Sequence, residues 1–280
     1  MTRRDQVLQR AATQLAAVSE SARLDAELLL AHTLGCARSA LTLHGAALLS
    51  PTEAAEFAAL VAQRLDHVPV AYLLGVKEFW SLSLQVTPAV LVPRPETEVL
   101  VEQALQLLPA GSAGSVLDLG TGSGAIALAV ATERPQAQVT GSDVSEAALA
   151  IAAANGARLG LRQIRWRAGS WFDAVPGERF DLIVSNPPYV AADDPHLQAL
   201  TAEPRSALSL GPTGLEAYEL LIPAARDHLT AMGWIVLEHG ASQAPQIQNL
   251  LEVNGFYNVR SHPDYAGALR VTLGSLHSNA

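Results

Sequence analysis

The stretch that most constrains the fold is an apolar strand pattern that runs into a glycine-rich loop and then into an alanine-rich helix pattern. The strand pattern covers residues 115–119, the loop reads Gly120-Thr121-Gly122-Ser123-Gly124, and the helix pattern begins at Ala125. Glycines let the backbone turn sharply and approach a ligand closely, while the helix start offers free N–H groups. The alternation of strands and helices continues beyond Ser112, which predicts a mostly parallel sheet covered on both faces.

Seven strand patterns occur in this part of the chain, over residues 115–119, 138–143, 163–167, 180–184, 233–238, 257–260 and 268–273. The short connection between the last two predicts an antiparallel pair at one edge. We therefore predict an α/β fold with a doubly wound, seven-stranded, mostly parallel sheet of the Rossmann-like type. Its domain is expected to span residues 94–280.

The N-terminal part of the chain has a different pattern. Residues 1–75 carry apolar positions at helical spacing, with helix starts expected behind Ser21 and at Ser50-Pro51 and a short helix expected over 37–44. Its histidines lack metal-ligand spacing, and no catalytic constellation occurs there. We predict a small helical bundle domain over 1–75 that recognises a partner and does not itself react.

Residues 76–93 are expected to join the two domains as a β-hairpin. Aromatic and β-branched residues alternate over 79–86, and Val90-Leu91-Val92 follows a turn signal at Thr87-Pro88. The next segment, Arg94-Pro95-Glu96-Thr97-Glu98, is expected to open a helix with Pro95 in its first turn. Glu96 and Glu98 could contact a ligand or cap that helix, and the pattern leaves both roles open.

Composition excludes several classes of protein. The chain has 280 residues and a formal net charge of −9, which argues against long nucleic acid as its main partner, because phosphate binding relies on basic surface. It has no run of roughly 18 apolar residues and no secretory signal pattern, so we expect a cytoplasmic protein without membrane contact. The single cysteine, Cys36, rules out an intramolecular disulfide and a cysteine-based zinc site.

The glycine-rich loop indicates a nucleotide-type ligand without deciding which one. The strand before it contains Asp118, and the next strand ends in Asp143, which is placed to accept hydrogen bonds from a ribose diol. Gly120, Gly122 and Ala125 also satisfy the dinucleotide pattern, so the loop alone fits either NAD or S-adenosylmethionine. Trp171, after the third strand of this part, could cover an adenine.

A second motif, Asn186-Pro187-Pro188-Tyr189, follows the apolar run 180–184 and so falls at the same edge of the expected sheet. The Asn186 side-chain oxygen and the Pro187 carbonyl can both accept hydrogen bonds, because a proline keeps its C=O while it lacks an N–H. The prolines stiffen this backbone, and the Tyr189 ring can lie against a flat group. These features suit methyl transfer to a planar, conjugated nitrogen. The alternative is a Pro-Pro turn with Tyr189 as a rim aromatic.

Taken together, these motifs resemble those of class I S-adenosylmethionine-dependent methyltransferases, and among them the peptide-chain release factor glutamine N-methyltransferases. The resemblance extends over nearly the whole chain and includes Pro69-Val70-Ala71-Tyr72-Leu73-Leu74-Gly75, Glu78-Phe79-Trp80, Arg94-Pro95-Glu96-Thr97-Glu98, Glu203-Pro204-Arg205 and Glu238-His239-Gly240. A sister family that methylates a ribosomal-protein glutamine shares the Asn-Pro-Pro-Tyr element. The Arg-Pro-Glu-Thr-Glu segment and Trp171 favour release factors.

The resemblance implies an enzyme that transfers a methyl group from S-adenosylmethionine, without a metal, to the glutamine of the Gly-Gly-Gln motif in release factors. The helical domain would dock the factor, and the protein would act as a monomer. The loop residues Gly120, Thr121, Gly122, Ser123 and Gly124 would approach the methionine part of the cofactor, Asp143 its ribose and Trp171 its adenine. Asn186 and Pro187 would bind the amide N–H hydrogens, with Pro188 beside them, and Tyr189 would hold the plane of the amide; Asn186 would also contact the cofactor.

Other readings of the same residues remain. An adenine-N6 nucleic-acid methyltransferase would use the same motif, because adenine also presents a conjugated amino group, but the acidic balance opposes it. An NAD-dependent oxidoreductase fits the loop considered by itself. A non-enzymatic adaptor would need a degenerate cofactor pocket. Glu238 and His239 end a strand at the ligand-bearing edge, where we expect a structural role.

Overall fold

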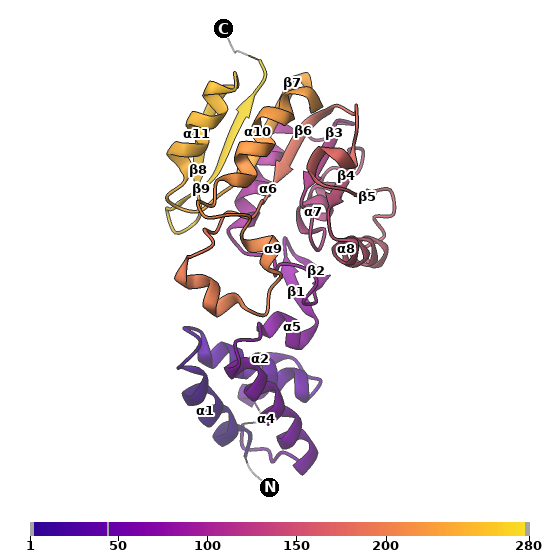
Figure 1. Ribbon diagram of the computed structural model, residues 1–280. Coiled ribbons are helices and arrows are strands. Elements are labelled where there is room, and N and C mark those ends of the chain that lie inside the picture. The colour runs from indigo at the N-terminus through magenta and orange to yellow at the C-terminus, as the bar shows by residue number, and fades with distance from the viewer. Residues whose placement is uncertain (1–2, 44, 278–280) are drawn as a thin grey trace. The chain divides into compact units, whose positions relative to one another are not determined.

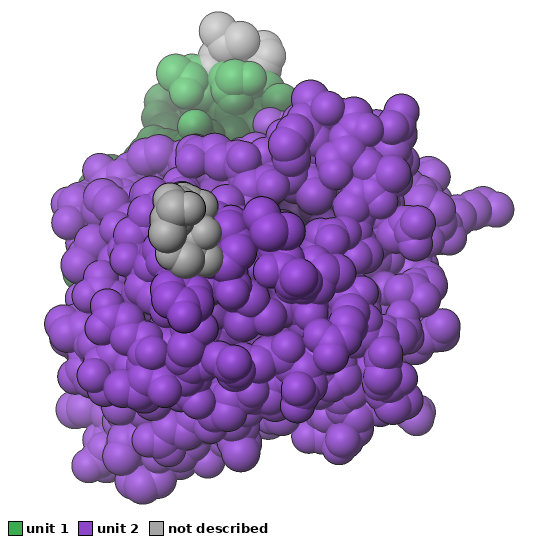
Figure 2. All heavy atoms as spheres, turned by 90° about the horizontal axis from the view of Figure 1, so that it is seen from above, with its two compact units in different colours: residues 1–76, 199–202 green, residues 77–198, 203–280 purple. Residues whose placement is uncertain are grey.

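The computed structural model describes residues 3–43 and 45–277. His44, at the end of the third predicted helix, lies outside the described residues. The chain divides into two compact units, shown in green and purple in Figure 2. The first unit runs to Val76 and includes Ala199–Ala202, and the second comprises Lys77–Gln198 and the chain from Glu203 onward.

The first unit is helical and occupies the indigo end of the ribbon in Figure 1. Its helices are α1 (Arg4–Leu15), α2 (Ala22–Thr33), α3 (Arg38–Leu43), α4 (Pro51–Leu65) and α5 (Val70–Leu74). Their apolar faces meet in one cluster, in which Leu15, Leu29 and Leu30 are fully buried. The helical bundle expected in this part of the chain is therefore present.

The starts of two helices can be compared with the sequence signals. At α4 the prediction is confirmed by a capping box, because Glu53 N donates to Ser50 Oγ over 3.2 Å and Ser50 N donates to Glu53 Oε2 over 2.7 Å. Ser21 does occupy the N-cap position of α2, but its hydroxyl accepts no backbone N–H of the helix and donates to Asp25 Oδ1 over 3.1 Å.

The β-hairpin is present, but its turn lies elsewhere than predicted. β1 (Val76–Phe79) pairs with β2 (Leu82–Gln85), so Trp80 and Ser81 form the turn. The expected turn at Thr87-Pro88 between two strands is wrong, because residues 90–92 form no strand. The backbone N–H of Val92 donates to Glu203 Oε2 over 3.0 Å and has no strand partner.

Side-chain acceptors explain why the turn forms at Trp80 and Ser81. Both have positive φ angles, 52° and 59°, a backbone conformation that is unfavourable for residues with a Cβ atom. Trp80 N donates to Glu98 Oε1 over 2.9 Å, and Ser81 N donates to Glu78 Oε1 over 2.6 Å. These charge-assisted hydrogen bonds offset the backbone cost.

The second unit contains a seven-stranded sheet with the order β5-β4-β3-β6-β7-β9-β8. Its strands are β3 (Ser115–Leu119), β4 (Gln138–Asp143), β5 (Arg165–Ala168), β6 (Phe180–Ser185), β7 (Leu229–Glu238), β8 (Tyr257–Pro263) and β9 (Leu269–Ser275). β5, β4, β3, β6 and β7 are parallel, and β9 is antiparallel to both β7 and β8. The predicted α/β fold, with its mostly parallel sheet and antiparallel edge, is confirmed.

Helices cover both faces of this sheet (Figure 1). The longer ones are α6 (Thr97–Leu107), α7 (Ala125–Glu133), α8 (Glu146–Arg158), α10 (Glu216–His228) and α11 (Ala244–Val253), with α9 (Arg205–Leu208) and the 3-10 turns η1 (Trp171–Ala174) and η2 (Pro195–Leu200) between them. α6 begins at Thr97, so Pro95 precedes the helix and does not occupy its first turn. No helix among residues 3–43 and 45–277 is long and apolar enough to span a bilayer.

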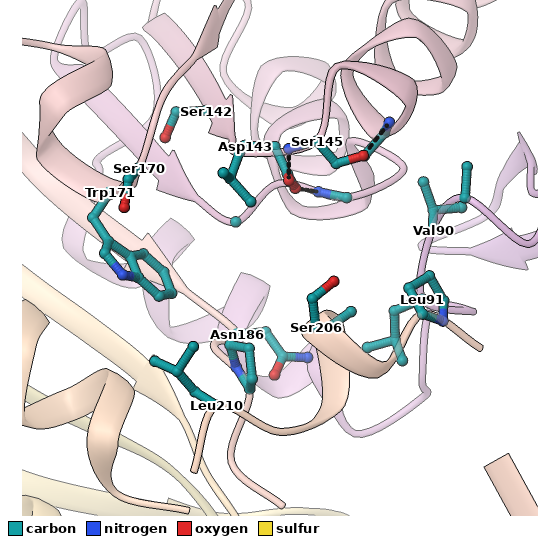
Figure 3. A pocket seen from close by; sticks show the side chains of 18 of the residues that line it. Val90, Leu91, Ser142, Asp143, Ser145, Ser170, Trp171, Asn186, Ser206 and Leu210 are labelled. Atoms are coloured by element: carbon teal, nitrogen blue, oxygen red, sulfur yellow. Dashed lines mark hydrogen bonds between the residues drawn. The ribbon is translucent and has the colours of Figure 1, made fainter. Parts of the chain in front are cut away.

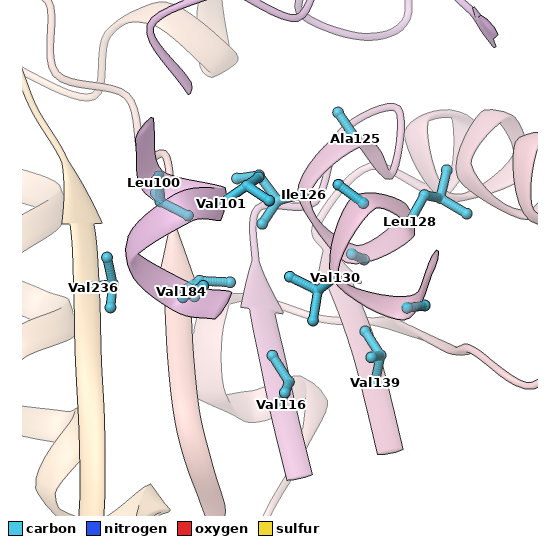
Figure 4. Close-up of a cluster of buried hydrophobic side chains, with 14 of the residues drawn as sticks. Leu100, Val101, Val116, Ala125, Ile126, Leu128, Val130, Val139, Val184 and Val236 are labelled. Carbon is cyan, nitrogen blue, oxygen red and sulfur yellow. The ribbon is translucent and has the colours of Figure 1, made fainter. Parts of the chain in front are cut away.

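The core of this unit consists of two apolar layers, one on each face of the sheet. Figure 4 shows the first layer, in which α6 and α7 pack on side chains such as Val116 and Val184. The second layer packs α10 and α11 against Leu117 and Ile183. Because neighbouring strand residues point to opposite faces, each parallel strand supplies both layers. The strands are thus fixed rigidly, and their carboxyl ends form a stable edge.

Candidate active site

A cavity of about 300 Å³ lies at the carboxyl ends of the parallel strands in the second unit. Figure 3 shows its interior, with Asp143, Ser145 and Trp171 around one part and Asn186, Leu91 and Leu210 around another. β3, β4 and β6 all end at this edge, so three loops far apart in sequence meet there. Open parallel sheets bind ligands at this position.

The carboxyl group of the buried Asp118 holds the glycine-rich loop in place. Asp118 Oδ2 accepts from Thr121 Oγ1 over 2.6 Å and from the backbone N–H of Ala127 over 3.1 Å, so one oxygen fixes both the loop and the first turn of α7. Burial raises the pKa of Asp118 to about 7, against the effect of these two hydrogen bonds. Its Oδ1 has no hydrogen-bond partner among the described residues.

Asp143, at the end of β4, is held by two backbone donors. Its Oδ2 accepts from Gly122 N and its Oδ1 from Ser145 N, each over 2.9 Å (dashed in Figure 3). Thr121 N also donates to Ser142 O over 2.8 Å, which ties the loop to β4. Each carboxylate oxygen retains acceptor capacity, because it has two lone-pair sites. Asp143 is therefore fixed in position and still able to bind a hydroxyl group.

Trp171 places a flat aromatic surface along the cavity wall (Figure 3). It begins the turn η1 with a φ angle of 48°, which is uncommon for a residue with a Cβ atom. A Cβ built on Gly120 would lie 3.9 Å from the Trp171 ring, so the loop and the ring face each other closely.

Of the five loop residues predicted to bind cofactor, Gly120 and Gly122 line the cavity. The side chains of Thr121 and Ser123 within the loop are buried, with 5% and 2% exposure. Gly124 adopts a φ angle of 83°, and a Cβ there would lie 3.1 Å from Ala152, Leu128 and Trp166 atoms. Cofactor contact by all five residues remains a prediction, while the packing of Thr121, Ser123 and Gly124 gives them a role in shaping the loop.

The Asn186-Pro187-Pro188-Tyr189 segment leaves the end of β6 at the same edge. Asn186 and Pro188 line the cavity, whereas Pro187 is buried. Asn186 Nδ2 donates to Thr97 Oγ1 over 3.3 Å. Tyr189 Oη lies 3.5 Å from Glu238 Oε1, and burial together with that carboxyl raises the pKa of Tyr189 well above its usual value. The segment thus brings an amide and an aromatic ring together beside the cavity.

Two carboxyl groups, Glu238 and Glu96, both act to raise the pKa of Tyr189. Glu238, at the end of β7, is 1% exposed, and burial raises its pKa to about 7, with Glu96 acting in the same direction. Hydrogen bonding from Thr97 and the charge of Arg270 oppose that rise. Glu98 has a different role, because it accepts from the hairpin turn at Trp80. Ligand contact and helix capping by Glu96 and Glu98 stay predictions.

His239 is fully buried beside Glu238, and both of its ring nitrogens are satisfied within the protein. Nδ1 lies 2.9 Å from Gly240 O, so Nδ1 carries the proton, because a carbonyl can only accept. Nε2 then accepts from Thr272 Oγ1 over 2.7 Å. Burial lowers the pKa of His239. These contacts agree with the expected structural role.

No group of three or more metal-ligating side chains occurs within residues 3–43 and 45–277. The residues that line the cavity include one carboxylate, several serine hydroxyl groups and a tryptophan ring.

Comparison with known proteins bears on what such a cavity does. Two family models match the chain, the PrmC N-terminal domain over residues 6–75 and the Methyltransferase small domain over residues 96–211. A release factor glutamine methyltransferase from Xylella fastidiosa is 51% identical over 261 residues, which cover 92% of this chain and 95% of that protein. Another, from Escherichia coli, is 42% identical over 269 residues, covering 95% and 96%. The chain belongs to the release factor glutamine methyltransferase family.

A solved methyltransferase from Pyrococcus furiosus shares the fold of this methyltransferase, with a TM-score of 0.57 and 20% identity over 78% of this chain and 100% of that one. The relatives from Xylella fastidiosa and Escherichia coli confirm the family resemblance found in the motifs, and with it the classification of the protein as an enzyme.

Two walls of the methyltransferase cavity come from segments that the motifs did not reveal. One wall is formed by residues 89–91 and the other by Pro204, Ser206, Ala207 and Leu210. An ion pair between Arg94 and the buried Glu203 joins the two segments beside the cavity. The sequence pattern assigns residues 90–92 to a strand, and Glu203-Pro204-Arg205 enters only as part of the resemblance. Val90-Leu91 follows a proline turn signal, and Leu210 is an apolar residue with 47% exposure, so neither carries a local signal of ligand contact.

Proposed function

We propose that this enzyme transfers a methyl group from S-adenosylmethionine to the side-chain amide nitrogen of the glutamine in the Gly-Gly-Gln motif of a peptide-chain release factor. The observation that carries the proposal is the position of Asn186. Its carboxamide lines the cavity, which also contains the Gly120 and Gly122 backbone, Asp143 and Trp171. An amide-binding group and a nucleotide-type binding wall therefore share one cavity.

The cavity residues fit S-adenosylmethionine. Its volume of about 300 Å³ lies at the lower end of the range of ligand pockets, roughly 300–1,000 Å³. Asp143 has the acceptor capacity for ribose hydroxyls, and the Trp171 ring suits an adenine face. Gly122 has a φ angle of 55°, and a Cβ there would meet no atom within 4 Å, so the loop leaves open space toward a ligand. When bound, the cofactor supplies an electrophilic methyl group on a positively charged sulfur.

The chain's own residues would orient the acceptor amide. Asn186 Oδ1 and the Pro187 carbonyl would accept its N–H hydrogens, and Pro188 and Tyr189 would restrict its plane. An amide nitrogen is a weak nucleophile because its lone pair is delocalised, so a fixed orientation is the main source of rate enhancement. The nitrogen becomes acidic only as the methyl group bonds to it, so no strong base is needed to remove its proton.

We also propose a division of labour along the chain. Residues 1–75 would form the domain that recognises the release factor, residues 76–93 the hairpin linker and residues 94–280 the methyltransferase domain. The match of the PrmC N-terminal domain to residues 6–75 supports the first assignment. The names of the similar proteins from Xylella fastidiosa and Escherichia coli support release factors as substrates. We propose that the enzyme acts in the cytoplasm as a monomer.

The test is transfer of labelled methyl from S-adenosylmethionine to a purified release factor. The matched controls are the same factor with its Gly-Gly-Gln glutamine changed to alanine, a glutamine-bearing ribosomal protein, and adenine-containing RNA and DNA. We expect label on the unmodified factor alone. Label on the ribosomal protein, or on nucleic acid, in place of the factor would overturn the proposal.

A further inference from the structure

The orientation of the Asn186 carboxamide is set by a buried threonine. Asn186 Nδ2 donates to Thr97 Oγ1 over 3.3 Å, and Thr97, the first residue of α6, is 4% exposed. The oxygen and nitrogen lie at opposite ends of one planar amide. A contact that holds Nδ2 therefore turns Oδ1 away from Thr97. The two residues are far apart in sequence, so only the fold brings them together.

A hydroxyl group could in principle hold either end of an amide, because it both donates and accepts. Its other partner decides which end. Hydrogen bonding from the Thr97 side chain also opposes the rise in the pKa of Glu238, which is 1% exposed at the end of β7. In its ionised form Glu238 can only accept, so it takes the single hydroxyl proton. Thr97 Oγ1 is then left as an acceptor, in agreement with the 3.3 Å contact from Asn186 Nδ2.

We propose that Thr97 and Glu238 are positioning residues that hold Asn186 with Oδ1 directed toward the acceptor amide. This inference rests on the proposed function, in which Asn186 Oδ1 accepts an N–H of the substrate glutamine. With the carboxamide reversed, Asn186 would present its own NH₂ group to the substrate NH₂ group, and neither could accept from the other. Glu238 also lies 3.5 Å from Tyr189 Oη, so one buried carboxyl is adjacent to both acceptor-binding side chains.

The arrangement separates acceptor orientation from cofactor binding. Thr97 does not line the cavity, and its side chain interacts with Asn186 and Glu238. The cofactor wall is held by a different set of hydrogen bonds, from Gly122 and Ser145 to Asp143 and from Thr121 to Asp118. Loss of the Thr97 hydroxyl should therefore slow transfer and leave cofactor affinity intact.

The experiment compares three variants in the full-length enzyme. Thr97→Val removes the hydroxyl with little change in shape, Thr97→Ser restores it, and Glu238→Gln gives that position an NH₂ donor. Thr132→Val is the matched control, because its hydroxyl bonds only within its own helix, to Leu128 O over 2.8 Å. For each variant, kcat and KM are measured on a release factor, the dissociation constant for S-adenosylmethionine by calorimetry, and folding by circular dichroism.

We expect Thr97→Val and Glu238→Gln each to lower kcat by about tenfold or more, the scale of one misdirected hydrogen bond in a transition state. The dissociation constant for S-adenosylmethionine should change by less than about twofold, and Thr97→Ser should recover most of the lost kcat. Thr132→Val should behave as the wild type. If Thr97→Val does not fold, Glu238→Gln and Thr97→Ser carry the comparison.

Provided that wild-type enzyme methylates the factor, three results would overturn the inference. They are full activity of folded Thr97→Val or Glu238→Gln, equal losses in Thr97→Val and Thr97→Ser, and a loss of cofactor affinity as large as the loss in kcat. Absence of transfer by wild-type enzyme is a different failure. It would overturn the proposed function, and the inference with it.

Discussion

Asp118 should make the second unit less stable as the pH rises, and Asp118→Asn should remove that effect. Burial raises the pKa of this carboxyl from 3.8 to about 7, so the folded state holds the proton more tightly than the unfolded state. The contribution of Asp118 to stability is then fully present below about pH 4 and is lost as the pH rises toward and through 7. The interval between these two pKa values corresponds to about 4 kcal/mol of unfolding free energy.

Between about pH 5 and about pH 8, roughly 3 kcal/mol of this change should be measurable. The side chain that Asp118→Asn introduces cannot ionise, so the unfolding free energy of the variant should gain about that much relative to wild type across the interval. The new amide nitrogen would take the place of Oδ1, which has no partner among the described residues, and its cost is independent of pH. Glu238 contributes in the same direction in both proteins and cancels in the comparison.

The assay is urea unfolding followed by tryptophan fluorescence at a series of pH values. All four tryptophans, Trp80, Trp166, Trp171 and Trp234, lie in the second unit, so the signal reports on the unit that contains Asp118. Asp193→Asn, at an exposed position, controls for the loss of one charge. Parallel pH dependences of wild type and Asp118→Asn would refute the reasoning.

Three further predictions test the site and the packing. Asn186→Ala should lower kcat by about a hundredfold while the dissociation constant for S-adenosylmethionine, measured by calorimetry, stays within about threefold; equal losses in both would contradict the assignment. Gly141→Ala should lower the unfolding free energy by about 1–3 kcal/mol in urea, because a Cβ there would lie 2.5 Å from Trp166 Cζ3. A loss that is no smaller in a Trp166→Leu background would show that the ring is not the cause. Ser50→Ala should cost about 1 kcal/mol through loss of the capping box with Glu53, measured by thermal melting, and an unchanged midpoint would count against it.

The sheet could be predicted because its signals are local. Strands such as β3 and β6 are mostly apolar runs, and the loop 120–124 needs positive φ angles at its glycines. Asp143 and Asn186 follow their strands directly, so placing the strands also placed these side chains at one edge. Their common position in the cavity follows from parallel pairing alone.

The hairpin turn could not be predicted, because long-range contacts determine it. Trp80 and Ser81 are poor candidates for positive φ angles, and the Thr87-Pro88 pair is the stronger local turn signal. Glu98, 18 residues away, accepts the Trp80 N–H and stabilises the unexpected turn. Neither residue indicates this contact by itself.

The cavity walls and the contacts of Thr97 and Glu203 could not be predicted from the sequence for the same reason. Thr97 binds Asn186 from 89 residues away, and Glu203 binds Arg94 from 109 residues away. A threonine at a helix start ordinarily predicts a cap, so nothing in the local pattern connects Thr97 to an amide at the end of β6. Such contacts become visible only once the fold places the segments together.

Tandem mass spectrometry of a release factor, after incubation with S-adenosylmethionine and this enzyme, tests the central claim most directly. The account predicts a single added methyl group on the side-chain amide nitrogen of the Gly-Gly-Gln glutamine, with far less product from Asn186→Ala at equal cofactor occupancy. A methyl group on any other atom of the factor, or equal product from wild type and Asn186→Ala, would contradict it.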